Sequence, residues 1–418
     1  MTSTDLTIGF ARLSDCASLV AAKERGEFEK QGLNVTLKRY ASWAAMRDAL
    51  AHGVIDAAQM LAPMVVGSAA GLGPYPGAFS TSFSINLNGN AITVSNTLYE
   101  TIKALDPNSL IQRPLLPSAL KTIAAKRREC GEDPLTFAHV YHYSMHGYEL
   151  RYWLAAAGLE PDSDVKLVVV APEQMVTSLE NGLIDGYCVG EPWNSAAIDA
   201  NLGKTLITSS EIWSNAPEKV LAVRKNWSQQ NVETHVAIIK AMLKASQWID
   251  RPDNRLTAAQ IVSRPEYVDM PLDIVQPSLT GKGVHTGGDL IENMPDFNVF
   301  HRYSANYPWR SHAKWIFSQM VRWGEALSGT DADGVAEAAY NPELYRTAAD
   351  ELGIAYPNVD EKLEGAHTHA WLQENASSPI AMGPDTFMDG KIFNPSISGQ
   401  TGEKIQVMSD FVSAKRAG

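Results

Sequence analysis

The sequence predicts an α/β fold of two lobes, each a mostly parallel sheet flanked by helices. The first observation is length, because 418 residues exceed the roughly 100–200 residues of one ordinary domain. The second is a repeat: Leu-x-x-Gly-x-Ile-Asp, followed by Pro, occupies residues 50–63 and again 179–192, offset by 129 positions. The third is the β-α-β-α-β order expected around each copy, which is typical of parallel sheets covered by helices.

The first unit begins with a strand expected at 7–10, because apolar residues there lead into a polar loop. A helix is expected at about 16–30, with Ser14 and Asp15 as candidate N-caps and Gly32 at its end. The remaining elements are a strand at 35–40, a helix at 43–52 capped by Ser42 and closed by Gly53, and a strand at 55–60.

The second unit follows the same order. It is expected to contain a strand at 137–143, a helix at 148–157, a strand at 165–170, a helix from 172 to 181 and a strand at 184–189. A strand at 90–95 leads to a first crossing at Ser95-Asn96, and 206–209 forms the return crossing. The first lobe is therefore predicted at 1–95 plus 210–418, and the second at 96–209. Beyond Trp213 we expect helices at 232–249, 258–262, 311–324 and 342–352, then an extended surface tail from about Ser377.

Composition excludes several classes of function. The net charge of −12 argues against direct binding to nucleic acid or to an anionic membrane surface. The scattered Cys16, Cys130 and Cys188 form no zinc or disulfide pattern. No P-loop, G-x-S-x-G or H-E-x-x-H motif occurs, so we expect neither an enzyme nor a bound cofactor. No apolar run approaches ~18 residues, and no export signal precedes the first strand, which predicts a cytoplasmic location.

Candidate ligand residues lie in the loops that follow strands, where open α/β sheets bind ligands. Trp43 offers an apolar wall and an indole N–H, or packs as a core residue. Asn90 offers an amide, or makes a turn; His146 donates an N–H, or caps its helix. Gly190 allows close backbone approach to a ligand. Lys219 is the positive charge expected to reach the cleft, or a solvated surface lysine.

Metal ligation is a weaker interpretation of the remaining polar residues. His139 and His142 lie at i and i+3 of an expected strand and would point to opposite faces. His367 and His369 supply only two ligands. Glu191 disfavours an anion unless it orients donors or binds a cation. We therefore predict no metal site.

Longer stretches carry a family resemblance. They include Ser42-Trp43-x-x-Met46-Arg47-Asp48, Asn88-Gly89-Asn90-Ala91-Ile92, Leu150-Arg151-Tyr152-Trp153-Leu154, Cys188-Val189-Gly190-Glu191-Pro192-Trp193-Asn194 and Pro217-Glu218-Lys219. With these the chain resembles the nitrate-binding and bicarbonate-binding proteins of ABC transporters from about residue 7 to 395. The resemblance implies a two-lobed periplasmic-binding-protein fold of type II. It also implies a nitrate site of Trp43, Asn90, His146, Gly190 and Lys219, with Asn90 standing where the family has glutamine.

The resemblance also implies a biological role. Without an export signal, the chain is most similar to cytoplasmic nitrate/nitrite sensors (NasS-type), which hold an ANTAR-domain antiterminator protein and release it when nitrate or nitrite binds. The alternative is the substrate-binding component of a nitrate or bicarbonate ABC transporter. A pyrimidine-synthesising enzyme on the same fold is disfavoured, because such enzymes carry clustered cysteines for iron.

Overall fold

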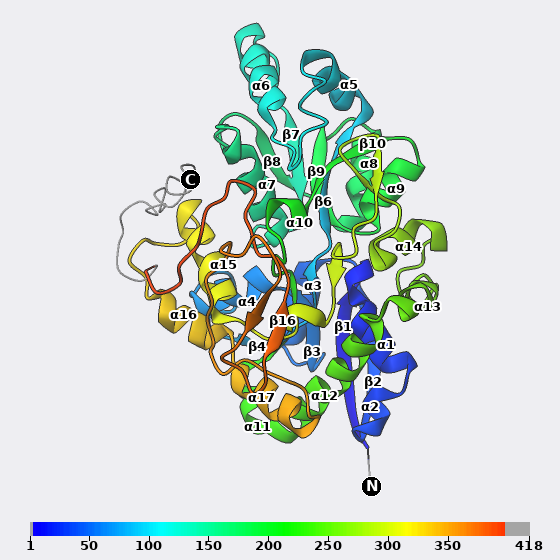
Figure 1. Cartoon of the computed structure of the whole chain (residues 1–418), viewed down its shortest axis with the longest axis vertical. Coiled ribbons are helices and arrows are strands. Elements are labelled where there is room, and N and C mark those ends of the chain that lie inside the picture. The colour runs from blue at the N-terminus through cyan, green and yellow to red at the C-terminus, as the bar shows by residue number, and fades with distance from the viewer. Residues whose placement is uncertain (1–2, 398–418) are drawn as a thin grey trace, which may run out of the picture.

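The computed structural model describes residues 3–397 and consists of two α/β lobes (Figure 1). The sheet of the first lobe has the order β2-β1-β3-β11-β4, with β11 antiparallel to both of its neighbours. The sheet of the second lobe has the order β10-β6-β9-β7-β8, with β6 antiparallel to β9 and β10. The strands are β1 (Thr4–Ala11), β2 (Leu33–Tyr40), β3 (Ala57–Leu61), β4 (Phe79–Ser84) and β11 (Lys219–Arg224) in the first sheet, and β6 (Asn90–Ser95), β7 (Thr136–His139), β8 (Lys166–Val169), β9 (Gly186–Gly190) and β10 (Gly203–Thr208) in the second.

The predicted repeat is present in the strand register. Ile8 of β1 pairs with Ala57 of β3, and Phe137 of β7 pairs with Gly186 of β9. Both pairs are related by the 129-residue offset found in the sequence. The β-α-β-α-β order is thus confirmed in both lobes, with parallel pairing as expected for strands joined by helical crossovers.

Helices cover the sheets on both faces (Figure 1). Those of the first unit are α1 (Ala17–Glu24), α2 (Glu27–Lys30), α3 (Trp43–Ala51) and α4 (Ala62–Ala69). Those of the second lobe are α5 (Asn96–Leu105), α6 (Ser118–Cys130), α7 (Met145–Ala156), α8 (Met175–Glu180), α9 (Trp193–Asp199) and α10 (Ser209–Ile212). One buried apolar cluster runs through both lobes, from Leu61 and Val220 to Phe137 and Val189.

Three predictions about local structure are corrected. The expected helix at 16–30 is split, because Gly26 adopts φ +64° and separates α1 from α2. The expected strand at 137–143 ends at His139, where the backbone turns toward α7. The chain enters the second sheet at Asn90 rather than at the expected Ser95-Asn96 crossing, because β6 already pairs with β9 and β10.

The remainder of the chain packs mainly on the first lobe (Figure 1). Its last part, residues 353–397, is here called the C-terminal arm. The predicted tail is not merely a surface strand, because Asp385 and Phe387 of the arm are buried. The elements are β5 (Leu87–Asn88), α11 (Lys225–Gln230), α12 (Val232–Ile249), α13 (Pro252–Val262), α14 (Leu272–Thr280), β12 (Val284–Thr286), β13 (Leu290–Glu292), β14 (Asn298–Val299), α15 (Arg310–Arg322), α16 (Ala332–Ala339), α17 (Pro342–Glu351), β15 (Trp371–Gln373) and β16 (Ile380–Met382).

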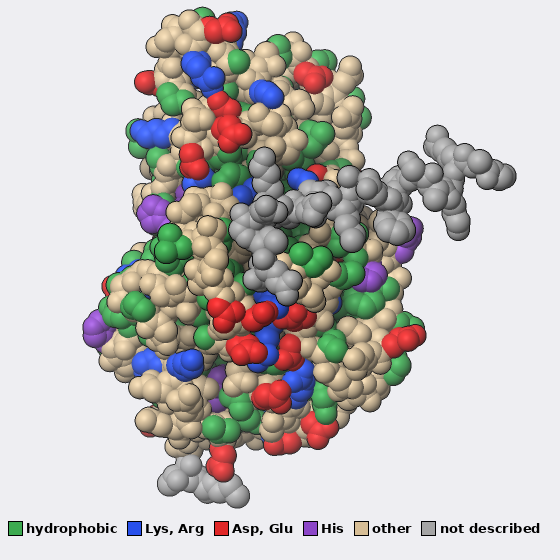
Figure 2. Space-filling view, turned by 90° about the vertical axis from the view of Figure 1, so that its left-hand side faces the viewer, with side chains coloured by type: hydrophobic (Ala, Val, Ile, Leu, Met, Phe, Trp, Pro, Cys, Tyr) green, Lys and Arg blue, Asp and Glu red, His purple; other side chains and the backbone are tan. Residues whose placement is uncertain are grey.

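Acidic and basic side chains are mixed on one face of the first lobe (Figure 2). Ion pairs between α15 and the residues around it include Lys314 with Glu361 at 2.5 Å and Arg310 with Asp360 at 3.1 Å. Within residues 3–397, no helix has both the length and the apolar character that a bilayer crossing requires.

Candidate functional site

The five predicted ligand residues come together where the two lobes meet. Asn90, the first residue of β6, pairs directly with Gly190, the last residue of β9. Lys219 begins β11, and its Nζ lies 5.5 Å from the centre of the Trp43 ring. His146 of α7 faces them, with Nδ1 3.3 Å from a carboxylate oxygen of the residue before Lys219. Residues from both lobes therefore surround one point, and their role in binding stays a prediction.

Two helix N-termini hold the predicted aromatic and imidazole groups in place. Ser42 caps α3 as expected, accepting a hydrogen bond from Ala45 N at 3.1 Å. Ser144 caps α7 in the same way through Gly147 N at 3.1 Å. Trp43 is thus the first residue of α3, and His146 lies in the first turn of α7. The free amides and positive dipole ends of such turns favour an anion.

Several buried polar atoms in this cluster have no hydrogen-bond partner among the described residues. They are Trp43 Nε1, Asn90 Oδ1, His146 Nε2 and Glu149 Oε1, while His146 Nδ1 makes no hydrogen bond but lies 3.3 Å from Glu218 Oε1. Trp43 is 3% exposed, while Asn90 and His146 are fully buried. Since buried polar groups are normally paired, the unpartnered atoms gathered at this interlobe position make it the candidate ligand site.

Lys219 is buried rather than solvated, and two carboxylates hold it. Its Nζ lies 2.8 Å from Asp15 Oδ2 and 2.5 Å from Glu218 Oε2. Gln59 Nε2 donates to the other oxygen of Asp15 at 2.5 Å. Burial opposes the charge of Lys219, but the two carboxylates outweigh it, so the pKa of Lys219 is raised. The lysine is therefore an ammonium whose charge is already balanced.

The carboxylates of this cluster are absent from the residues predicted as ligands. Asp15 is not the N-cap that the sequence predicts, because its side chain bonds Lys219 and Gln59 instead. Glu218 directly precedes Lys219 in the chain. Glu149 follows His146 by three residues, so Glu149 and His146 lie on one face of α7. Helical spacing from His146 was the signal that would have found Glu149.

Burial sets the protonation states around the pocket. Burial and then the negative charge of the nearby Glu218 raise the pKa of Glu149 to about 8. Burial also raises the pKa of Glu218, against the opposing effect of Lys219. For His146, burial and then the charge of Lys219 lower the pKa well below its usual value. The imidazole is therefore neutral, with one N–H to donate.

Glu191 lies beside the cluster but has a structural task. Its Oε2 accepts a hydrogen bond from Ser195 N at 3.1 Å at the start of α9. Its backbone oxygen accepts from Ser14 N at 2.7 Å, which joins the two lobes. Burial raises the pKa of Glu191 to about 7. This carboxyl orients backbone rather than the predicted ligand donors.

The crevice between the lobes is closed at its mouth. A cavity of about 10 Å³, room for about one water molecule, is lined by Arg12 and Trp43 from one lobe and by Pro172 and Glu173 from the other. Arg12 Nη1 lies 3.4 Å from Glu173 Oε2 across this opening. The two lobes are therefore in contact at this opening.

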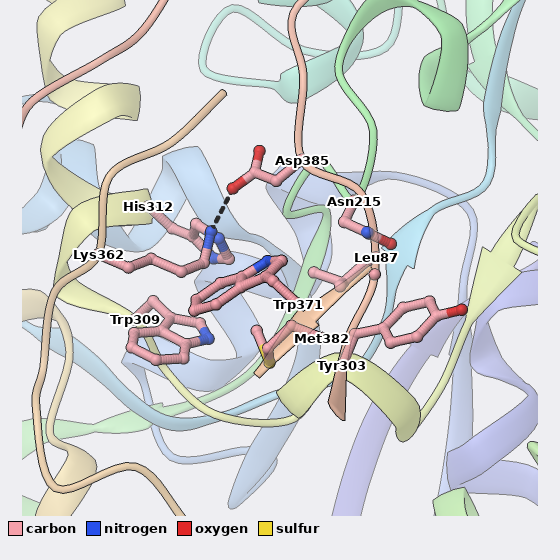
Figure 3. Close-up of a pocket in the computed structure, with 10 residues that line it drawn as sticks. Leu87, Asn215, Tyr303, Trp309, His312, Lys362, Trp371, Met382 and Asp385 are labelled. Atoms are coloured by element: carbon pink, nitrogen blue, oxygen red, sulfur yellow. Dashed lines mark hydrogen bonds and ion pairs between the residues drawn. The ribbon is translucent and has the colours of Figure 1, made fainter. Parts of the chain in front are cut away.

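A second small cavity lies beneath the C-terminal arm (Figure 3). Lys362 points toward Asp385, with Nζ 2.7 Å from Oδ2, and also pairs with Glu364. Trp213 Nε1 donates to the same aspartate at 2.8 Å. His312 lines the cavity, with Nε2 3.6 Å from Glu364 Oε1 and Nδ1 without a hydrogen-bond partner in the described chain. The group anchors the arm through a buried lysine between two carboxylates, as at Lys219.

The histidines weighed as metal ligands do not form a metal centre. The rings of His139 and His142 are 6.4 Å apart, and His139 Nδ1 bonds Tyr141 O at 2.9 Å. His367 stacks on Trp371 at 3.9 Å. Residues 3–397 contain no group of three or more His, Cys, Asp or Glu side chains placed to hold a metal ion.

Comparison with known proteins gives the family. The model of the NMT1-like family matches residues 1–263. The nitrate/nitrite binding protein NrtA of Synechococcus elongatus is 31% identical over 399 residues, covering 93% of this chain and 83% of that protein. The crystal structure of the periplasmic nitrate-binding protein NrtA from Synechocystis PCC 6803 matches with a TM-score of 0.79 at 27% identity, covering 95% of this chain and 97% of the other.

Two longer relatives match equally well. The nitrate import ATP-binding protein NrtC of Synechocystis is 35% identical over 399 residues, covering 94% of this chain. The bicarbonate transport ATP-binding protein CmpC of Synechococcus elongatus is 35% identical over 383 residues, covering 90% of this chain. In each case the chain spans 54% of the relative's own length. The chain is thus a two-lobed member of the NMT1-like family, homologous to the NrtA proteins of ABC transporters.

Proposed function

We propose that the protein binds nitrate or nitrite between its lobes. The observation that carries this proposal is the set of unpartnered buried atoms around Lys219. Trp43 Nε1 and one nitrogen of His146 are N–H donors without acceptors in the described chain, and an anion with several acceptor oxygens satisfies them together with the ammonium.

The charge of the pocket selects a monovalent anion. The carboxylates of Asp15 and Glu218 more than offset the single charge of Lys219, so the site offers no excess positive charge to a divalent ion such as sulfate. Nitrate carries one charge spread over three oxygens, and desolvating it costs less than desolvating a divalent anion. Neutral donors then suffice to hold it.

Ligand contacts from both lobes favour the closed form. Trp43 and Lys219 belong to the first lobe, while His146 and Glu149 lie on α7 of the second. An anion that touches both sides binds the closed form better than the open one and shifts the population toward closure. This population shift is the signal that a transporter or a partner protein reads.

The role best supported is the substrate-binding component of an ABC importer. The relatives named above act in nitrate import, nitrate/nitrite binding and bicarbonate transport. Bicarbonate is therefore the competing ligand. Nitrate is favoured because it needs only donors, and Trp43, His146 and Lys219 supply donors.

The sensor role that the sequence resemblance implies is a second proposal. A cytoplasmic protein of net charge −12 suits a basic protein partner of the ANTAR class rather than RNA itself. By reciprocal coupling, a partner that prefers the open form dissociates when nitrate closes the lobes. Co-purification of such a partner without nitrate, and its loss with nitrate, supports this role; cell fractionation that finds the protein only outside the cytoplasm contradicts it.

Titration calorimetry tests the binding proposal. Purified protein is titrated with nitrate, nitrite, bicarbonate and sulfate at one ionic strength. We expect saturable one-site binding of nitrate or nitrite and none of sulfate. Binding of bicarbonate alone would show that bicarbonate, not nitrate, is the ligand. Failure to bind any of the four anions would contradict the proposal.

A further inference from the structure

One buried carboxyl of the cluster has no part in the binding role described so far. Glu149 is 2% exposed and lies one helical turn after His146. Its Oε2 accepts a hydrogen bond from Asn90 Nδ2 at 3.0 Å and lies 3.9 Å from Cys188 Sγ. Its Oε1 has no hydrogen-bond partner in the described chain. The same pocket leaves Asn90 Oδ1 and His146 Nε2 unpartnered, so Oε1 belongs to the set of atoms awaiting a ligand.

The surrounding charges disfavour an ionised Glu149. The ammonium of Lys219 is engaged by Asp15 and Glu218. Glu149 shares a single amide with Glu218, whose Oε1 lies 3.2 Å from the same Asn90 nitrogen. If Glu149 were ionised, the cluster would hold three buried carboxylates and only one ammonium. An uncompensated buried charge costs far more free energy than a neutral acid.

The titratable groups around Glu149 come from several elements. They are Lys219 at the start of β11 and Glu218 just before it, Cys188 on β9, His146 on its own helix and Asp15 in the 3-10 turn after β1. Burial raises the pKa of the Cys188 thiol well above its usual value. Cys188 and His146 are therefore both neutral, and the negative charge that Glu149 faces is that of Glu218.

We propose that Glu149 is held as a neutral carboxylic acid and donates a hydrogen bond from Oε1 to the bound anion. This proposal rests on the proposed function and adds to it the protonation state of Glu149. Because Oε2 accepts from Asn90, the proton belongs on Oε1, where an O–H otherwise has no acceptor in the described chain. Glu149 thereby selects anions whose oxygens accept hydrogen bonds, and it sets the pH range in which they bind.

The test is the pH profile of nitrate affinity, measured by calorimetry from pH 6.5 to 9.5. If only the protonated form binds, the dissociation constant is flat near neutrality and rises above about pH 8, approaching tenfold per pH unit. Glu149→Gln keeps a donor at this position and should lack the break while binding nitrate within a few-fold of wild type at pH 7. Glu149→Met keeps the length without a donor, so it should bind about tenfold or more weakly than wild type at pH 7 and should also lack the break.

Glu191→Gln is the matched control, because Glu191 is also a buried carboxyl with a raised pKa but bonds Ser195 N rather than the pocket. It should retain the break near pH 8. In two buffers of different ionisation enthalpy, binding at pH 9 should take up about one proton per anion in wild type and none in Glu149→Gln.

Thermal melts establish that each variant is folded before its affinity is compared. A break that persists in Glu149→Gln, or wild-type affinity in Glu149→Met at pH 7, overturns the inference while leaving the binding site intact. Wild-type protein that binds no anion at any pH overturns the proposed function itself.

Discussion

Lys219 Nζ lies 2.8 Å from Asp15 Oδ2 in the interior of the protein, where neither side chain is more than 4% exposed. The strand that carries Lys219 and the loop that carries Asp15 are more than 200 residues apart in the chain. Lys219 also pairs with Glu218, so the proposed anion site contains a charged lysine whose positive charge is offset by carboxylates. The same arrangement recurs at Lys362, and this duplication supplies a control.

Replacing Lys219 by Met should abolish nitrate binding and destabilise the protein. Removal of one partner leaves two buried carboxylates without a counter-charge, which costs about 3–5 kcal/mol. Lys362→Met leaves Glu364 and Asp385 in the same situation, so it should lower the melting temperature similarly and keep nitrate affinity. Calorimetry and thermal melts of both variants check this. Wild-type affinity in Lys219→Met would show that the lysine does not contact the ligand.

Trp43→Phe should weaken nitrate binding by about 10–100-fold. The substitution keeps an aromatic wall but removes the unpartnered Nε1–H, and a hydrogen bond to a charged group contributes about 1.5–3 kcal/mol. Trp323→Phe is the control, because Trp323 Nε1 is likewise unpartnered in the described chain but its ring stacks with Arg322 away from the pocket. Equal losses in the two variants would remove Trp43 from the site.

Gly190→Ala should lower affinity without lowering stability. A Cβ at this position would meet Asn90 Oδ1 at 3.4 Å and Leu13 Cδ2 at 3.5 Å, which are ordinary van der Waals distances. The added methyl group should therefore be accommodated by the protein but should clash with a ligand that approaches the backbone of Gly190. In Gly186→Ala, on the same strand, the Cβ would lie 2.9 Å from Thr93 O and 2.8 Å from a Phe137 ring carbon. That variant should lose thermal stability. If Gly190→Ala binds nitrate like wild type, the ligand does not approach this strand.

Stability should fall as the pH drops below about 6.5. Burial lowers the pKa of His139 and of His235 to about 4, and it also lowers that of His146 well below its usual value. Between pH 6.5 and pH 4 the unfolded chain binds more protons than the native one. The free energy of unfolding contributed by these histidines at pH 7 is therefore lost as the pH falls through this range. Melting temperatures of wild type and His235→Gln from pH 7 to 4.5 measure the effect. The variant should show the shallower decline, and identical slopes would contradict this origin.

The fold was predictable because short local sequence motifs mark its repeat. Asp56 Oδ2 accepts from Thr7 N at 2.8 Å, and Asp185 Oδ2 accepts from Thr136 N at 2.7 Å. In each lobe this aspartate ties the start of one strand to its parallel neighbour, so a short motif marks the same junction twice. Glycine closing the preceding helix is equally local, with φ +72° at Gly53.

The polar surroundings of the site were not predictable in the same way. Asp15 and Glu149 reach Lys219 and Asn90 only through tertiary packing, and the local pattern around Asp15 equally favours a helix cap. The five ligand candidates came from the loops that follow strands, and the family resemblance then favoured them over their structural alternatives. Sequence spacing alone did not say that Lys219 is buried or that carboxylates balance its charge.

A crystal structure of the protein grown with nitrate is the decisive test of the proposed site. We predict one planar anion between the lobes, within hydrogen-bond distance of Trp43 Nε1, a ring nitrogen of His146 and Lys219 Nζ. Nitrate bound elsewhere, with these three groups untouched, would contradict it.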